Sequence, residues 1–161
     1  MSPKKILFVC TGNSCRSVMA QELMRHMLTR AGIDAVQVES AGVFAIHGMG
    51  PTHETIRTLQ DTGIVCSDHH ARLLTPLMVQ GADLILVMEP FQVEEVLRRD
   101  PSARPKVHLL KTYLAPPGEV SPHYTGIPDP IGKPLETYEV CFAEIREAIE
   151  RVLKAMGVHS A

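Results

Sequence analysis

The stretch that decides the fold is ILFVCTGNSCRS, residues 6–17. It begins within a short, continuous run of aliphatic and aromatic residues, Lys5–Val9, which predicts a buried strand. A small polar loop follows, and apolar residues then recur at helical spacing over Met19–Ala31, closed by Gly32. A cysteine therefore stands at the end of a strand, six positions before an arginine, in a loop that opens a helix.

The alternation of strand and helix continues along the chain. Continuous apolar runs predict further strands at Val36–Glu39, Asp83–Met88 and Lys106–Leu110. Helices are predicted at Thr52–Asp61, from Thr75 onward with Pro76 at the first position, at Pro90–Arg99, and from Leu135 to about Met156. The segment Tyr113–Pro134 is rich in proline and glycine and predicts a long loop. We expect one α/β domain, residues 1–161, with a four-stranded parallel sheet, helices on both faces and a phosphate-binding loop after the first strand.

Composition narrows the choice of partner and compartment. The chain has 161 residues and a net charge of −2 with both signs interspersed, so no basic stripe favours nucleic acid or a membrane surface. No apolar run approaches the length of a membrane span, and the N-terminus lacks the long apolar region of a signal peptide. We expect a cytoplasmic protein that works as a monomer.

Neither cysteines nor histidines show a metal-binding pattern. The adjacent His69 and His70 diverge on a helix or strand, and we interpret them as surface residues. The cysteines have no zinc-site spacing and are too few for a disulfide framework; they are Cys10, Cys15, Cys66 and Cys141. We expect neither a metal nor another cofactor.

The loop after the first strand has the chemistry of an anion cradle. Its successive backbone N–H groups, strengthened by the helix N-terminus, suit a tetrahedral dianion. Gly12 and Asn13 are residue types that tolerate the left-handed backbone angles such a cradle often requires. The predicted phosphate-binding residues are Thr11, Gly12, Asn13, Ser14, Cys15, Arg16 and Ser17.

Cys10 is expected at the floor of this cradle as a nucleophile. The N–H groups, Arg16 and the hydroxyls of Ser14 or Ser17 favour thiolate over thiol. Arg16 can hold two phosphate oxygens at once, which a lysine cannot. A thiolate beneath a clamped phosphoryl group suits in-line attack and a phosphocysteine intermediate.

A proton donor for the leaving group is predicted in GIPDPIGKP, residues 126–134. Asp129 follows the last predicted strand, so it belongs to the same sheet edge as Cys10. It can donate a proton to the leaving group and then, as a carboxylate, accept one from the attacking water. Taken alone, an aspartate beside proline is also typical of a simple turn.

These motifs together resemble the low-molecular-weight protein tyrosine phosphatase family. The resemblance is carried by CTGNSCRS after the first strand, by SAG at Ser40–Gly42 and by PDP at Pro128–Pro130. It extends over nearly the whole chain, including GADLILVM and the final helix. It implies a four-stranded parallel sheet, a phosphocysteine mechanism and no metal.

The resemblance also assigns roles to individual residues. It implies that Cys10, Arg16 and Asp129 are nucleophile, clamp and general acid. It further implies that Asn13 and Ser40 hydrogen-bond to each other and hold the loop in shape.

The predicted substrate pocket departs from the tyrosine-specific pattern. Family members of that kind usually carry aromatic residues after the Asp-Pro pair and a few residues after the SAG segment, where Ile131 and Ile46 stand here, although Phe44 is close. A ring without aromatic walls loses stacking of about 1 kcal/mol per pair. Thr11, with SAGVFA, resembles the protein arginine phosphatase branch. We therefore favour phosphoarginine over phosphotyrosine, with Thr11, Ile46 and Ile131 lining the pocket.

Two other activities are open alternatives. Thioredoxin-coupled arsenate reductases share the loop closely, but they need a second cysteine pair after the third strand, and residues 88–100 contain none. Phosphocysteine carrier domains of sugar transport systems use a similar strand, loop and helix, but need neither Arg16 nor an equivalent of Asp129.

Cys15 admits two interpretations. It is either a resolving thiol, which forms a reversible disulfide with oxidised Cys10 and protects it, or a small residue packed at the helix start. We favour the redox role slightly.

Overall fold

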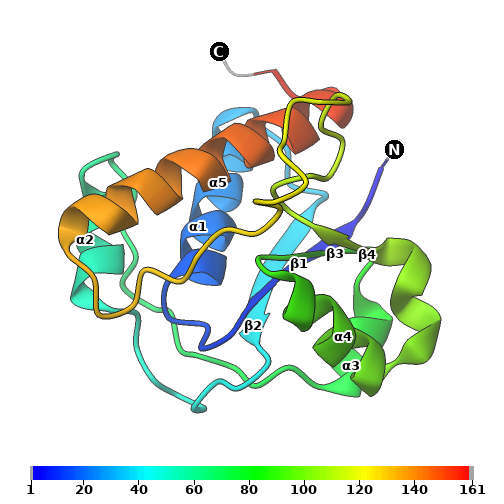
Figure 1. The fold of residues 1–161 in the computed structure, drawn as a ribbon. Helices are drawn as coiled ribbons and strands as arrows, with labels where there is room; N and C mark the ends of the chain where they lie inside the picture. The colour runs from blue at the N-terminus through cyan, green and yellow to red at the C-terminus, as the bar shows by residue number, and fades with distance from the viewer. Residues whose placement is uncertain (1, 160–161) are drawn as a thin grey trace.

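The computed structural model describes residues 2–159 (Figure 1). The strands are β1 (Lys5–Cys10), β2 (Gln37–Gly42), β3 (Leu84–Val87) and β4 (Val107–Leu109). The helices are α1 (Arg16–Arg30), α2 (His53–Gln60), α3 (Pro76–Gly81), α4 (Pro90–Arg99), the short 3₁₀ helix η1 (Pro101–Lys106) and α5 (Leu135–Ala155). Every predicted strand and helix is present, and 113–134 is a long connection without regular structure, as expected.

The four strands form one parallel sheet in the order β2-β1-β3-β4. β1 is a central strand and pairs with both β2 and β3, so its carboxyl end is flanked by the ends of two neighbours. Cys10 lies opposite Gly42 in this register. The α/β fold predicted from the sequence is confirmed.

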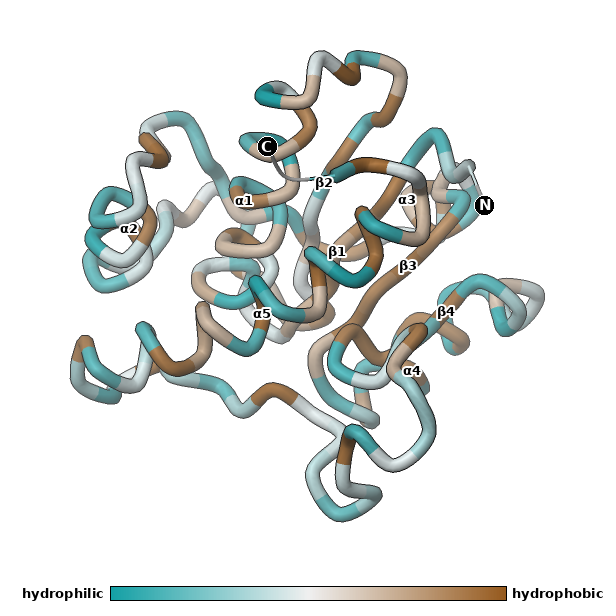
Figure 2. The backbone as a smooth tube through the Cα atoms, turned by 90° about the horizontal axis from the view of Figure 1, so that it is seen from above, coloured by the Kyte–Doolittle hydropathy of each residue, from teal (hydrophilic) through white to brown (hydrophobic). Residues whose placement is uncertain are grey.

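Alternate residues of β1 face two separate cores. Ile6 and Phe8 pack with the buried faces of α1, α2 and α5, whereas Leu7 and Val9 pack with those of α3 and α4. The two groups of helices lie on opposite sides of the sheet in Figure 1. In Figure 2 the trace of β3 is brown along its length, as expected for a strand covered on both faces. The functional edge of the sheet is therefore held between two packed layers.

Local signals explain where several helices begin. Thr52 caps α2 by accepting a hydrogen bond from the Thr55 N–H at 3.2 Å, and Thr75 caps α3 in the same way from Met78 at 3.2 Å. Pro76 occupies the first position of α3, where a missing N–H costs nothing. Among residues 2–159, no helix combines the length and apolar character needed to cross a membrane.

The second strand differs from its prediction. We expected it to end at Glu39, with Ser40–Gly42 beyond it, but these residues are its last three. Pairing with β1 extends the strand, because Ser40 lies opposite Phe8 and Gly42 opposite Cys10. As a result Ser40 is buried beside the loop.

Candidate active site

Cys10 is the last residue of β1 and is buried, with its sulfur held by the loop that follows. The backbone N–H of Asn13 donates to the Cys10 Sγ at 3.3 Å, and the Ser17 Oγ lies 2.9 Å from it. Ser17 accepts a hydrogen bond from the Asn13 Nδ2 at 2.8 Å. Because Ser17 accepts that bond, its own hydroxyl proton is free to point at the Cys10 sulfur.

Asn13 holds the loop in shape. It is fully buried and adopts a left-handed backbone conformation with φ of 53°, whereas Gly12 does not adopt a positive φ. Its side-chain amide donates to Ser40 Oγ at 2.9 Å and accepts from the backbone N–H of Arg72 at 2.9 Å. Ser40 in turn donates to Gln21 Oε1 at 2.7 Å. The side-chain bond expected between Asn13 and Ser40 is present.

His69 does not lie free on the surface, contrary to the prediction, although His70 is exposed. His69 is half-buried, and its Nε2 is 2.8 Å from the Asn13 carbonyl oxygen. Burial lowers its pKa, only partly offset by that bond, so the ring is neutral at neutral pH and donates to the carbonyl. No three His, Cys, Asp or Glu side chains within residues 2–159 are grouped so that they could hold a metal ion.

Gly42 allows β2 to approach the loop closely. A Cβ at this position would lie 2.5 Å from the Thr11 carbonyl oxygen and 2.8 Å from the Asn13 nitrogen. The backbone N–H groups of Val43 and Phe44 donate to the Cys10 and Thr11 carbonyls, each at 2.9 Å. The loop carbonyls are thereby bound by the two residues that follow β2, and the close approach at Gly42 makes the SAG segment part of the site's construction.

Arg16 is buried at the first position of α1 and belongs to the same site. Its Nη1 donates to the Ile127 carbonyl oxygen at 2.7 Å and to the Glu89 carboxylate, and its Nη2 lies 3.5 Å from Asp129 Oδ2. Burial alone would lower its pKa, but the facing Cys10, Glu89 and Asp129 together raise it above the ordinary value.

One donor of Arg16 is unpaired. Within residues 2–159 the buried Nε finds no hydrogen-bond acceptor. A buried donor without a partner costs free energy, so its retention suits an anionic ligand that would accept from it.

Asp129 lies beside Arg16 at the edge of the sheet where β1 ends, as its position after β4 predicts. Its side chain is 37% exposed, and its Oδ1 accepts a hydrogen bond from the Ile131 N–H at 3.1 Å. The carboxylate lies beside the guanidinium of Arg16 and is partly open to solvent. The three residues predicted to carry the chemistry therefore lie together.

Two site residues were missed by sequence reasoning. Glu89 and Gln92 follow β3, whose carboxyl end lies beside that of β1. Glu89 contacts Arg16, and Gln92 donates from its Nε2 to the Thr11 hydroxyl oxygen at 3.1 Å. The rule that located Asp129, namely attention to the ends of parallel strands, could have located Glu89.

The predicted pocket residues are placed less specifically. Ile46 is 68% exposed and Ile131 54% exposed, and Thr11 is half-buried with its oxygen bonded to Gln92. Ile131 touches the site through its backbone bond to Asp129. Their role in substrate choice stays a prediction.

Cys15 is buried beside the cradle. Its sulfur lies 3.7 Å from the Ser14 hydroxyl, 3.6 Å from that of Thr52 and 3.6 Å from that of Tyr138. The backbone of Ser14 also accepts from Thr52 N and Thr55 Oγ1, at 3.2 and 3.1 Å. These contacts fasten the cradle to α2 and α5.

A family model for low molecular weight phosphotyrosine protein phosphatases matches residues 5–160. The chain belongs to this family. It is thus a cysteine-dependent protein phosphatase.

Curated relatives include both kinds of protein phosphatase. A probable low molecular weight protein-tyrosine-phosphatase, EpsP of Ralstonia nicotianae, is 36% identical over 147 residues, covering 91% of this chain and 92% of that protein. A protein-arginine-phosphatase of Geobacillus stearothermophilus is 32% identical over 154 residues, covering 96% and 97%. Arsenate reductase 2 of Staphylococcus epidermidis is 31% identical over 150 residues, covering 93% and 96%.

Solved structures share the whole fold. A Cys-to-Ser mutant of the YwlE arginine phosphatase with a phosphorylated active-site serine superposes with a TM-score of 0.85 at 31% identity, covering 95% of both chains. The tyrosine phosphatase Wzb of Escherichia coli K30, in complex with sulphate, superposes with a TM-score of 0.84 at 28% identity, covering 97% of this chain and 100% of that one.

Proposed function

We propose that this enzyme hydrolyses phosphoarginine side chains of proteins in preference to phosphotyrosine. The observation that carries the proposal is the pair of carboxylates, Glu89 and Asp129, that face the Arg16 guanidinium at the mouth of the cradle. A departing arginine side chain becomes a cation when it is protonated, and neighbouring carboxylates stabilise a cation. A departing phenol is neutral after protonation and gains nothing from the second carboxylate.

The reaction proceeds in two steps. The Cys10 thiolate attacks phosphorus in line, the P–N bond breaks, and Asp129 gives its proton to the leaving nitrogen. Water then attacks the phosphocysteine, Asp129 accepts its proton, the P–S bond breaks, and phosphate leaves. Arg16 and the loop N–H groups hold the phosphoryl oxygens through both steps, which supplies the electrostatic stabilisation.

The mouth of the site supports the same preference. Ile131 and Ile46 are exposed aliphatic residues, so they offer a phenol ring no stacking partner. Thr11 accepts from Gln92 and keeps its own hydroxyl proton available to donate to a polar substrate. We propose that these three side chains border the bound substrate.

The test compares two peptides of one sequence that carry either phosphoarginine or phosphotyrosine. We expect kcat/KM for phosphate release at neutral pH to be higher for phosphoarginine, with Cys10→Ser inactive on both. Glu89→Gln keeps the shape and removes the charge, so it should lower kcat/KM for phosphoarginine by about tenfold more than for phosphotyrosine. Glu94→Gln, on the exposed face of α4, is the matched control and should change neither. Preference for phosphotyrosine, or equal effects of Glu89→Gln on both peptides, would overturn the proposal.

Arsenate reduction is disfavoured by the state of the remaining cysteines. The relay needs reactive thiols, but burial raises the pKa of Cys66 to about 11 and that of Cys141 to about 12. Residues 88–100, where the cysteine pair is expected, follow β3, include α4 and contain no cysteine. Turnover of arsenate with thioredoxin, without phosphatase activity, would reverse this preference.

We also propose that Cys15 protects the nucleophile by a redox reaction. Peroxide converts the Cys10 thiolate to a sulfenic acid, and attack by the Cys15 sulfur forms the disulfide and releases water. Support comes from its position in the same loop, buried and surrounded by hydroxyls that can donate hydrogen bonds to its sulfur. Action as a cytoplasmic monomer on phosphoproteins stays a prediction from the sequence.

A further inference from the structure

Gln92 lies between the segments that carry the nucleophile, the second carboxylate and the general acid. It is fully buried in the first turn of α4, although glutamine is a residue type found mostly on surfaces. Its amide is used on both sides. The Oε1 accepts from the backbone N–H groups of Met88 and Glu89, at 2.8 and 2.9 Å, and the Nε2 donates to Thr11 at 3.1 Å.

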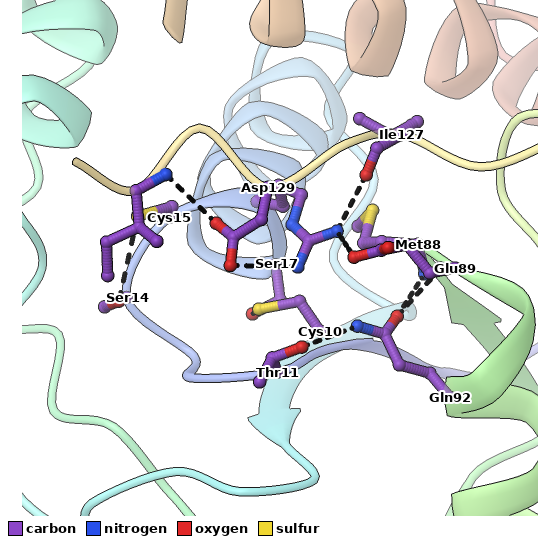
Figure 3. Close-up of polar contacts among 12 residues, drawn as sticks. Cys10, Thr11, Ser14, Cys15, Ser17, Met88, Glu89, Gln92, Ile127 and Asp129 are labelled. Atoms are coloured by element: carbon purple, nitrogen blue, oxygen red, sulfur yellow. Dashed lines mark hydrogen bonds and ion pairs between the residues drawn. The ribbon is translucent and has the colours of Figure 1, made fainter. Parts of the chain in front are cut away.

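The bonds of Gln92 continue to the segment that carries Asp129. The Met88 carbonyl oxygen accepts from the Ile127 N–H at 2.8 Å, and the Ile127 carbonyl oxygen accepts from Arg16 at 2.7 Å. Hydrogen bonds therefore run from Thr11 through Gln92, Met88 and Ile127 to Arg16, which belongs to the same loop as Thr11. Figure 3 shows most of these contacts around the site. Asp129 stands two residues after Ile127, so this closed ring of hydrogen bonds holds the segment that carries Asp129.

We infer that Gln92 is a positioning residue, which sets the distance between the phosphate loop and the segment that carries the general acid. It contacts neither the phosphoryl group nor the leaving group; it acts through Thr11 on one side and through Met88 and Ile127 on the other. An amide suits this position because one end must accept from two N–H groups while the other donates to a hydroxyl. A leucine of similar size can do neither.

The consequence is specific to proton transfer. If the ring loosens, Asp129 is displaced from the leaving group more than Arg16 is displaced from the phosphate, because α1 and the loop bonds still hold Arg16. Misalignment of a catalytic group costs rate steeply. The loss should therefore be larger for a substrate whose leaving group needs a proton than for one that departs easily.

The experiment measures kcat/KM for phenyl phosphate, a poor leaving group, and p-nitrophenyl phosphate, a good one. For Gln92→Leu we expect a fall of about tenfold with phenyl phosphate and of about twofold with p-nitrophenyl phosphate. Thr11→Val should show the same selective loss, whereas Thr11→Ser, which keeps the hydroxyl, should retain the activity. The double variant Thr11→Val with Gln92→Leu should lose little more than either single variant. Gln60→Leu, the same change at an exposed position of α2, is the control and should change neither value.

The inference rests on the proposed role of Asp129, and the design separates the two. In Asp129→Asn the selective loss with phenyl phosphate should appear, and adding Gln92→Leu should produce no further selectivity. If Asp129→Asn itself shows no selectivity, the proton-donor role fails. The inference is overturned if Asp129→Asn is selective while Gln92→Leu lowers kcat/KM equally for both substrates. It is also overturned if Gln92→Leu lowers only the melting temperature, because Gln92 is then a structural residue.

Discussion

The phosphate loop, residues 10–17, and the proline-rich segment, residues 113–134, supply the two halves of the active site and are built in opposite ways. In the loop, the side chain of one buried residue, Asn13, forms hydrogen bonds with Ser17, Ser40 and Arg72. In the segment, Asp129 is 37% exposed, and its neighbourhood is tied to the sheet edge by the bond from Ile127 to Met88. The loop that carries Cys10 is therefore held by contacts from several sides, whereas the segment that carries Asp129 is held by fewer.

This difference follows from what each half does. The cradle must present its N–H groups in one fixed geometry, because preorganised donors need no rearrangement during the reaction. The proposed acid, Asp129, would have to meet leaving groups that enter and depart with the substrate, which agrees with its partial exposure. We therefore expect damage to the loop to affect stability and catalysis together, and damage to the segment to affect catalysis alone.

Among substitutions that leave Cys10 in place, the largest effect is expected from Arg16→Lys. A lysine ammonium cannot reach Ile127, Glu89 and Asp129 together or hold two phosphate oxygens, so kcat/KM should fall about 10²–10³-fold. Binding of inorganic phosphate, followed by calorimetry, should weaken in parallel. Cys10→Ser is the comparison, because it should abolish turnover while retaining phosphate binding. Equal phosphate affinity in the two variants would mean that the loop N–H groups, and not Arg16, hold the anion.

Gly42→Ala tests how rigid the loop is. The new Cβ would lie 2.5 Å from the Thr11 carbonyl oxygen, and backbone must move to accept it. We expect a loss of about 1–3 kcal/mol in the free energy of unfolding, and a fall of about 10²-fold in kcat/KM if the cradle shifts by about 1 Å. Chemical denaturation measures the free energy of unfolding, and steady-state kinetics measure kcat/KM.

The control for Gly42→Ala is Gly50→Ala. A Cβ at Gly50 meets no atom within 4 Å, so neither stability nor rate should change appreciably. If Gly42→Ala kept full activity while losing stability, the loop would tolerate displacement, and the contrast between the two halves would not hold.

Much of the site could be predicted because the decisive residues are local to strand ends. Cys10 and Arg16 stand in one strand, loop and helix, and parallel pairing brings the end of β4 to the same edge, where Asp129 lies. Ser40 was located correctly as a neighbour of the loop, although β2 runs further than its sequence indicates. Its last residues have weak strand preference and are extended by their pairing with β1.

The residues outside the loop that form hydrogen bonds with Asn13 or with Ser40 could not be predicted in the same way. His69 and Arg72 belong to a segment without regular secondary structure, so no periodicity of the sequence indicates which way they face. Gln21 stands on α1 among polar residues that resemble a solvated face, yet it is buried against Ser40. These contacts depend on tertiary packing, which a local pattern does not contain.

The smallest change in kcat/KM is expected from Cys15→Ser, as long as no peroxide is present. After peroxide, this variant should differ clearly from the parent enzyme. Serine can keep the hydrogen bonds to Ser14, Thr52 and Tyr138, so kcat/KM should stay within about twofold of the parent enzyme. After mild peroxide and then thiol, the parent should regain most of its activity, whereas Cys15→Ser should not, because its Cys10 proceeds to irreversible oxidation states. Before the thiol is added, mass spectrometry should find a loss of two hydrogens in the parent and two or three added oxygens in the variant. Equal recovery would make Cys15 a packing residue of the cradle; unequal recovery would show that the rigid half of the site moves far enough for the two sulfurs to meet.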